Sequence, residues 1–171
     1  MNVYLTARMK TFDEFQELYD KKYLNEPDDG KTLIFYAAGN TKIEERYRLV
    51  NYLIDEGADV HVLERDKNSL LHVLLGHVLH DLPSEVVLCR RLIEMGVDIN
   101  ILNNKNVLAI QWLINMKYSD EKLKPLYDLW FEQDYVDVTT KNAWGYSPLE
   151  LAEKNPLRAD LVRRMLSLIH I

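Results

Sequence analysis

The stretch Leu53-Ile54-Asp55-Glu56-Gly57-Ala58-Asp59-Val60-His61 returns later in the chain as Leu92-Ile93-Glu94-Met95-Gly96-Val97-Asp98-Ile99-Asn100. Each copy reads as the apolar end of a helix, a glycine suited to the left-handed position after a helix, and a short extended segment. The two glycines are 39 residues apart. A fixed period in this range is typical of stacked repeats. The sequence therefore predicts a row of similar units.

The composition suits a compact soluble unit or a short repeat array, with 171 residues, 47% hydrophobic and 28% charged. No apolar run approaches the ~18 residues of a membrane-spanning helix. The N-terminal residues lack the apolar core of a signal peptide, so we expect a cytoplasmic protein. The single cysteine, Cys89, cannot form an internal disulfide, which fits a reducing compartment.

The net charge is −6, and residues 1–66 carry 14 Asp and Glu against 9 Lys and Arg. A general nucleic-acid binder would show a basic stripe, so we expect no nucleic acid partner. An acidic surface permits steering toward a basic protein. A surface kept acidic for solubility explains the same charge equally well.

Helical patterns follow one another along the chain. Thr11 and Glu14 have the spacing of a capping box, which predicts a helix over 11–22, after a short helix or turn in 1–10. Thr32 is placed to cap a short helix, and a longer one is expected over 43–56. Apolar residues from 123 to 131 predict a core-facing helix with Pro125 in or just before its first turn. A last helix is expected over 158–169.

A second motif opens each unit. It reads Gly30-Lys31-Thr32-Leu33-Ile34-Phe35-Tyr36-Ala37-Ala38, then Ser69-Leu70-Leu71-His72, then Val107-Leu108-Ala109-Ile110, then Gly145-Tyr146-Ser147-Pro148-Leu149-Glu150-Leu151-Ala152. Together with the stretches at Gly57 and Gly96, these segments resemble the ankyrin repeat, in which D-x-x-G-x-T-P-L-H-x-A-A opens a unit and G-A-D-V-N ends it. The resemblance covers nearly the whole chain, and the third unit is degenerate.

The resemblance implies an all-α fold, an ankyrin-repeat solenoid of stacked helix-turn-helix units with short β-turn fingers. The predicted single domain over 1–171 consists of an N-terminal cap (1–25), repeats over 26–63, 64–102 and 103–139, and a fourth repeat that doubles as the C-terminal cap (140–171).

The chain departs from the family in two ways. Residues 32, 69, 107 and 147, which we align, are 37, 38 and 40 residues apart, against ~33 in the family. The additional residues are expected over 74–86 and 115–123, between the helices of a unit and on the side opposite the fingers. Lys67 and Lys105 stand where the family has the finger glycine, so each must accept a positive φ angle or reshape the turn.

The sequence offers little chemistry. His77 and His80 are three residues apart, whereas metal-binding helices commonly place ligands four apart and add a third. The resemblance gives His72 a structural role, so we expect no metal and no cofactor. Cys89 has no base at recognisable spacing, and no nucleotide-binding or hydrolase motif occurs. We therefore expect no enzyme; a metal-dependent or cysteine enzyme is the remote alternative.

Ankyrin proteins hold other proteins on a concave surface formed by fingers and first helices, so the resemblance implies a non-catalytic protein-binding module. The short acidic chain looks like bacterial ankyrin proteins, some of which are immunity proteins that neutralise a cognate toxin. A basic toxin domain would complement the charge. An adaptor or host-directed effector is the alternative. We expect a protein partner, no membrane, and a monomer before the partner binds.

The family register gives the candidate contact residues. Trp144 and Tyr146 flank Gly145, and exposed aromatic residues of this kind are common hot spots, although packing onto the neighbouring finger is equally expected. The full predicted set is Asp28, Asp29, Lys31, Asn40, Arg65, Asp66, Asn68, His77, Asn103, Asn104, Asn106, Asn115, Trp144, Tyr146 and Lys154.

Overall fold

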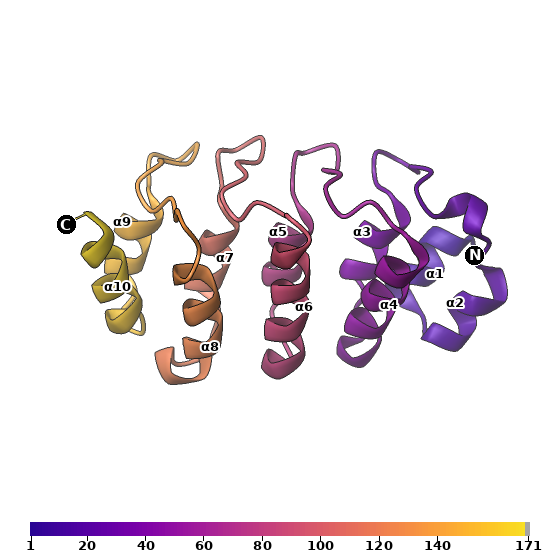
Figure 1. Cartoon of the computed structure of the whole chain (residues 1–171), viewed down its shortest axis with the longest axis horizontal. Helices are drawn as coiled ribbons and strands as arrows, with labels where there is room; N and C mark the ends of the chain where they lie inside the picture. Colours follow the sequence, from indigo (N-terminus) through magenta and orange to yellow (C-terminus); the bar gives the residue numbers. More distant parts are fainter. Residues whose placement is uncertain (170–171) are drawn as a thin grey trace.

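The computed structural model describes residues 1–169, which form ten α-helices, one short 3-10 helix and no strand (Figure 1). The only bridge in this part of the chain joins Asp28 and Lys31. The helices are α1 (Val3–Met9), α2 (Phe12–Leu18), η1 (Lys21–Tyr23), α3 (Leu33–Ala38), α4 (Ile43–Glu56), α5 (Leu70–Leu75), α6 (Leu82–Glu94), α7 (Ala109–Asn115), α8 (Asp120–Phe131), α9 (Pro148–Glu153) and α10 (Ala159–Ile169).

The helices form two layers along one row. Helices α1, α3, α5, α7 and α9 contact one another in that order, and α2, α4, α6, α8 and α10 do the same in the second layer. Each of the first four helix pairs is followed by a loop that projects from one edge of the row, at the top of Figure 1, while the turns within pairs lie at the opposite edge. The loops are loop 1 (24–32), loop 2 (57–69), loop 3 (95–108) and loop 4 (132–147). The structure is that of a helical repeat protein.

The stretch that repeats in the sequence has the predicted structure. Gly57 and Gly96 have φ angles of 103° and 96°, in the left-handed region where a side chain would be strained. After each glycine an aspartate side chain accepts the amide two residues on: Asp59 Oδ1 lies 2.9 Å from the His61 nitrogen, and Asp98 Oδ1 lies 2.8 Å from the Asn100 nitrogen. The recurrence of an aspartate at this position predicts a structural turn residue, and these hydrogen bonds confirm that role for Asp59 and Asp98.

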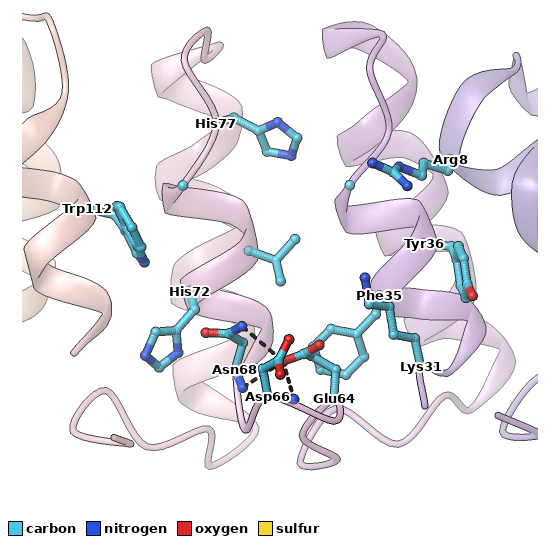
Figure 2. Close-up of a pocket in the computed structure, with 13 residues that line it drawn as sticks. Arg8, Lys31, Phe35, Tyr36, Glu64, Asp66, Asn68, His72, His77 and Trp112 are labelled. Atoms are coloured by element: carbon cyan, nitrogen blue, oxygen red, sulfur yellow. Dashed lines mark hydrogen bonds between the residues drawn. The ribbon is translucent and has the colours of Figure 1, made fainter. Parts of the chain in front are cut away.

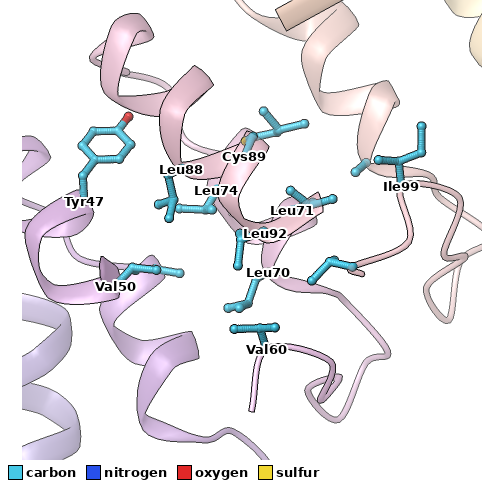
Figure 3. Packing of buried hydrophobic residues seen from close by; sticks show 14 of the residues in the cluster. Tyr47, Val50, Val60, Leu70, Leu71, Leu74, Leu88, Cys89, Leu92 and Ile99 are labelled. Carbon is cyan, nitrogen blue, oxygen red and sulfur yellow. The ribbon is translucent and has the colours of Figure 1, made fainter. Parts of the chain in front are cut away.

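The core is continuous from one helix pair to the next. Figure 3 shows the centre of the row, where Val50 of α4, Leu71 and Leu74 of α5, and Leu88 and Leu92 of α6 meet. All five side chains are buried. Because no pair could bury its apolar face alone, the pairs are stable only when stacked.

Two helices differ from the sequence prediction. The expected helix over 11–22 ends at Leu18, and Asp20 then accepts the Lys22 amide at 2.9 Å and starts η1 instead. A short side chain that bonds its own backbone in this way competes with the helix. Helix α8 starts at Asp120, capped by Ser119, so Pro125 lies inside the helix rather than in its first turn.

The third unit is shifted by one residue from the predicted alignment. The residues that cap the first helix of each pair are Thr32, Ser69, Leu108 and Ser147, so Leu108 replaces Val107 in the register. Val107 and Leu108 are both buried, and their apolar character could not tell the two alignments apart.

The shift also corrects the prediction for the glycine position of loop 3. Lys67 does take a positive φ, 64°, but in loop 3 the positive φ of 54° belongs to Asn106 and not to Lys105. Asparagine tolerates the left-handed region better than most residues.

The additional residues are divided differently from the prediction. Residues 76–81 form a loop between α5 and α6, whereas only 116–119 separate α7 from α8. Helix α8 has 12 residues against 14 in α4, so the added length of the third unit relative to the first lies in loop 4 and not between its helices. Both connections lie at the edge opposite loops 2 and 3, as expected (Figure 1).

Candidate functional site

A groove of about 390 Å³ crosses the first layer between α1 and α7 (Figure 2). Its floor is made by α3 and α5, and loops 1 and 2 form one rim. The side chains of Arg8, Lys31, Asp66 and Trp112 reach it and are at least partly exposed. Within residues 1–169, none of these four side chains takes part in a hydrogen bond or ion pair of the protein. The other lining residues are Phe35, Tyr36, Gly39, Glu64, Asn68, His72, Val73, Gly76 and His77.

A smaller hollow of about 180 Å³ adjoins the groove and shares Gly76, His77 and Trp112 with it. Val78, Met116 and Lys117 complete its wall. Val78 is 74% exposed and stands on the turn between α5 and α6. The two hollows therefore present a continuous surface across four helix pairs, and the Trp112 indole lines both hollows.

Two histidines on this surface, His72 and His77, are fixed by hydrogen bonds to the backbone. His77 Nε2 lies 2.7 Å from the Ala38 carbonyl oxygen, and burial lowers the pKa of His77 to about 4 despite that bond. His72 Nδ1 accepts the Ser69 amide at 3.1 Å, and its Nε2 faces the Val107 carbonyl at 2.7 Å. Burial lowers the pKa of His72 as well. Both imidazoles are neutral near pH 7 and serve as links between units.

One recurring hydrogen-bond pattern was not predicted from the sequence. In loops 2, 3 and 4 a side-chain oxygen five residues before the cap accepts two backbone amides of the same loop. Glu64 Oε1 accepts from Asp66 and Asn68, at 2.9 and 3.1 Å. Asn103 Oδ1 accepts from Lys105 and Val107, and Asn142 Oδ1 accepts from Trp144 and Tyr146. The recurrence of Glu or Asn at this spacing was the available signal. These bonds fix the shape of each loop.

The structure brings part of the predicted set together. Lys31, Asp66, Asn68 and His77 line the groove, and Asn115 lines the adjoining hollow beside His77. Asp28 accepts the Tyr36 hydroxyl at its carbonyl, 2.9 Å away, and lies outside the groove. Asp29 and Arg65 form an exposed ion pair of 2.9 Å between loops 1 and 2.

Two predicted contact residues have internal roles. Asn40 is fully buried, because its amide nitrogen donates to the Ala7 and Lys10 carbonyls at 2.7 and 3.0 Å. It therefore cannot contact a partner. Asn103 is committed to its own loop, and its amide nitrogen also donates to Asn68 Oδ1 at 2.9 Å. The one-residue shift of the third unit explains this misplacement, because Asn104, Lys105 and Val107 occupy the positions that were assigned to Asn103, Asn104 and Asn106.

The last predicted group lies at the tip of loop 4. Trp144 is 64% exposed and Tyr146 is 38% exposed, so neither packs fully onto the neighbouring loop. Lys154 Nζ stands 3.8 Å above the centre of the Tyr146 ring. This group does not line the groove.

Two residues considered for chemistry, Cys89 and His80, lie in the core. Cys89 is fully buried, and burial beside Glu85 raises the pKa of its thiol well above the ordinary value. His80 Nδ1 lies 2.8 Å from Glu85 Oε1, with both side chains inaccessible. No cluster of three or more His, Cys, Asp or Glu with metal-binding geometry occurs in residues 1–169. A search of the same residues also finds no helix with the length and apolarity needed to cross a membrane.

Comparison with known proteins finds a distant similarity to a protein named for ankyrin repeats. A Rickettsia felis protein named "Putative ankyrin repeat protein" is 28% identical over 120 residues, which is 67% of this chain. The chain spans about half the length of that relative, 51%. No family model matches the sequence. Among solved structures, a functionally unknown protein from Leptotrichia buccalis C-1013-b superposes with a TM-score of 0.87 at 24% identity, over 99% of this chain and 93% of the other. The second similarity is one of fold.

Proposed function

We propose that this chain is a non-catalytic ankyrin-type repeat protein that binds another protein across the groove and the loop tips. The groove is the observation that carries the proposal. Four side chains from consecutive helix pairs and their loops, Arg8, Lys31, Asp66 and Trp112, reach it without an internal partner among residues 1–169. Polar and aromatic side chains left free on a concave surface are what a protein interface uses.

The proposed function also assumes that the chain is divided into the repeats predicted from the sequence. The one-residue shift leaves the predicted repeats over 26–63, 64–102, 103–139 and 140–171 in place, because it moves residues within the third unit and not its ends. Residues 170–171 lie outside the described residues. The name of the Rickettsia felis relative supports repeats of the ankyrin type but not their exact bounds, and the stacked helix pairs of this chain would extend the concave surface over the whole row.

The experiment compares proteins that co-purify with the native chain and with variants. Lys31→Ala combined with Trp112→Ala should remove a specific partner, and so should Asp66→Lys, which changes an exposed side chain without internal bonds. Val87→Ala combined with Lys122→Ala, on the second layer, serves as the control because it also removes one lysine and one apolar side chain. Circular dichroism must show that all variants fold. Retention of every partner by both groove variants would refute the proposal.

The narrower function, an immunity protein against a toxin, rests on the acidic charge and on the bacterial resemblance. It requires that one partner be encoded beside this chain, be toxic alone, and bind more tightly than micromolar. An adaptor or host-directed effector would instead retain several partners. Stoichiometric metal in the purified protein, or an activity lost in Cys89→Ala or His77→Ala, would favour the enzyme alternative.

A further inference from the structure

The tip of loop 4 presents an indole that the fold does not use. Trp144 is 64% exposed and has no aromatic neighbour in the described chain. A tryptophan buries more apolar area in an interface than any other residue, and it is over-represented among hot spots. An exposed tryptophan offers apolar area that a partner can remove from water.

The backbone beneath this indole is fixed before any partner binds. Asn142 is 7% exposed, and its Oδ1 accepts the Trp144 amide at 2.9 Å and the Tyr146 amide at 3.2 Å. Its amide nitrogen donates to Gln111 Oε1 at 3.0 Å, which ties the loop to α7. Gly145 completes the turn with a φ angle of 88°. A pre-formed loop loses little conformational entropy on binding.

Three lysines lie near the tip of loop 4. The Lys105 carbonyl of loop 3 accepts the Ala143 amide at 2.8 Å, which places the tip of loop 3 beside that of loop 4. Lys154 lies over the Tyr146 ring. Within residues 1–169, neither lysine has a carboxylate within 4.0 Å, whereas Lys141 is 3.5 Å from Glu150. We call Trp144, Tyr146, Lys105, Lys141 and Lys154 the Trp144 patch.

The charge at the loop tips is mixed in loops 1 and 2 and basic at the Trp144 patch. Loops 1 and 2 carry Asp28, Asp29 and Asp66 together with Lys31, Arg65 and Lys67, whereas Lys105 lies on loop 3, Lys141 on loop 4 and Lys154 at the end of α9. The net charge of the chain favours a basic partner, but the local charge at the patch favours an acidic one. A nucleic acid fits less well, because the chain as a whole carries a net charge of −6.

We propose that the Trp144 patch binds an acidic segment of a partner protein, in which an apolar side chain packs on the Trp144 indole and flanking carboxylates face Lys105 and Lys154. This inference rests on the proposed function and adds the chemistry of the partner. Charge-assisted contacts at the rim of an apolar anchor give specificity and speed of association.

The probe is a phage-displayed library of random linear peptides, selected on the full chain. The selected peptides should be rich in Asp and Glu around an apolar residue. A synthetic peptide of this kind should bind Trp144→Ala at least about tenfold more weakly, and Tyr135→Ala nearly as well as the native chain. Tyr135 is the matched control, because it is an equally exposed aromatic residue of the same loop, also at 64%.

Charge is tested with Lys105→Glu combined with Lys154→Glu, which should lose the peptide. Lys42→Glu combined with Lys122→Glu changes the net charge equally but lies elsewhere, and it should retain the peptide. Neutral or basic consensus peptides would overturn the inference. So would stronger binding of single-stranded oligothymidine than of the peptide, or self-association of the native chain that Trp144→Ala abolishes.

The two proposals fail in distinguishable ways. Peptides that lose binding in the groove variant Lys31→Ala with Trp112→Ala, but not in Trp144→Ala, would overturn the acidic site and leave the protein-binding function intact. A library that yields no peptide dependent on either surface would count against both.

Discussion

Nε2 of His72 lies 2.7 Å from the carbonyl oxygen of Val107, and this bond joins helix α5 to loop 3 of the next unit. The hydrogen bond at Nδ1, the other ring nitrogen, decides which of the two nitrogens carries the proton and donates. Nδ1 faces the Ser69 amide, which can only donate, so Nδ1 accepts and the proton resides on Nε2. The hydrogen bond from the Ser69 amide to Nδ1 therefore requires a neutral imidazole.

The free energy of unfolding should fall as the pH drops from about 6.5 toward 4. Burial lowers the pKa of His72, and it lowers that of His77 to about 4, whereas histidine in an unfolded chain titrates near 6.5. Between these values the unfolded state binds more protons, so acid favours unfolding. Urea denaturation at several pH values measures this slope. Above about pH 5 the carboxylates stay charged and contribute little to it.

A matched pair of variants tests whether a buried histidine causes this dependence of stability on pH. His77→Gln keeps a donor for the Ala38 carbonyl but cannot titrate, so stability should depend less on pH. His61→Gln removes an exposed histidine and should leave the slope unchanged. If stability depended equally on pH in the native chain and in both variants, the buried His77 would not be the cause.

Arg158 should be the most sensitive polar residue of the C-terminal end. It is fully buried, and its guanidinium donates to the carbonyls of Ile114 and Tyr118 at 2.9 and 3.0 Å, as well as to that of Met116. Arg158→Met would leave the Met116 and Tyr118 carbonyls without this donor, while the Ile114 carbonyl keeps that of Asn155 at 3.0 Å, and it should cost about 3–5 kcal/mol in the free energy of unfolding.

A lysine at position 158 should not preserve the stability that Arg158 gives. Arg158→Lys keeps the charge but cannot reach three carbonyls with one ammonium, so most of the stability should be lost as well. Arg163→Met, at an exposed site of α10, is the control and should change the unfolding midpoint in urea little. Wild-type stability in Arg158→Lys would show that charge alone is sufficient.

Cys89 should be unreactive in the folded protein. It is fully buried, and the raised pKa of its thiol keeps the reactive thiolate scarce. A thiol reagent such as dithionitrobenzoate should label it only as fast as the chain unfolds, and quickly in concentrated urea. Rapid labelling of the native protein would revive the cysteine-enzyme alternative.

The sequence predicted those parts of the fold that single residues determine. Gly57 and Gly96 end their helices because glycine accepts a positive φ at no steric cost, and the helix over 43–56 was predicted to the residue. The structural role of Asp59 and Asp98 followed from their recurrence. Local signals of this kind need no knowledge of the neighbouring units.

The candidate site depended on contacts between units, which no local pattern encodes. Asn40 looked like a contact residue from its register, yet it is buried because α1 brings the Ala7 and Lys10 carbonyls to it. Arg8 and Trp112 were missed because each is ordinary in its own helix, and only the stacking of α1, α3, α5 and α7 brings them to one groove.

The shift of register in loop 3 makes two lysines respond oppositely to glycine. Lys67 has a φ of 64°, where a side chain is strained, so Lys67→Gly should raise the free energy of unfolding by about 0.5–1 kcal/mol. The φ of Lys105 is not positive, and Lys105→Gly should lower stability by about 0.5–1 kcal/mol, since it only adds freedom to the unfolded chain.

Chemical denaturation of the two variants beside the native chain measures this difference. Asn106→Gly is the internal reference, because Asn106 occupies the left-handed position of loop 3 with a φ of 54°, and asparagine is strained less there than lysine. Its gain should be smaller than that of Lys67→Gly. If Lys105→Gly stabilised the chain and Asn106→Gly did not, the register of the third unit described above would be contradicted. Val107 would then align with Thr32 and Ser69, as the sequence predicted.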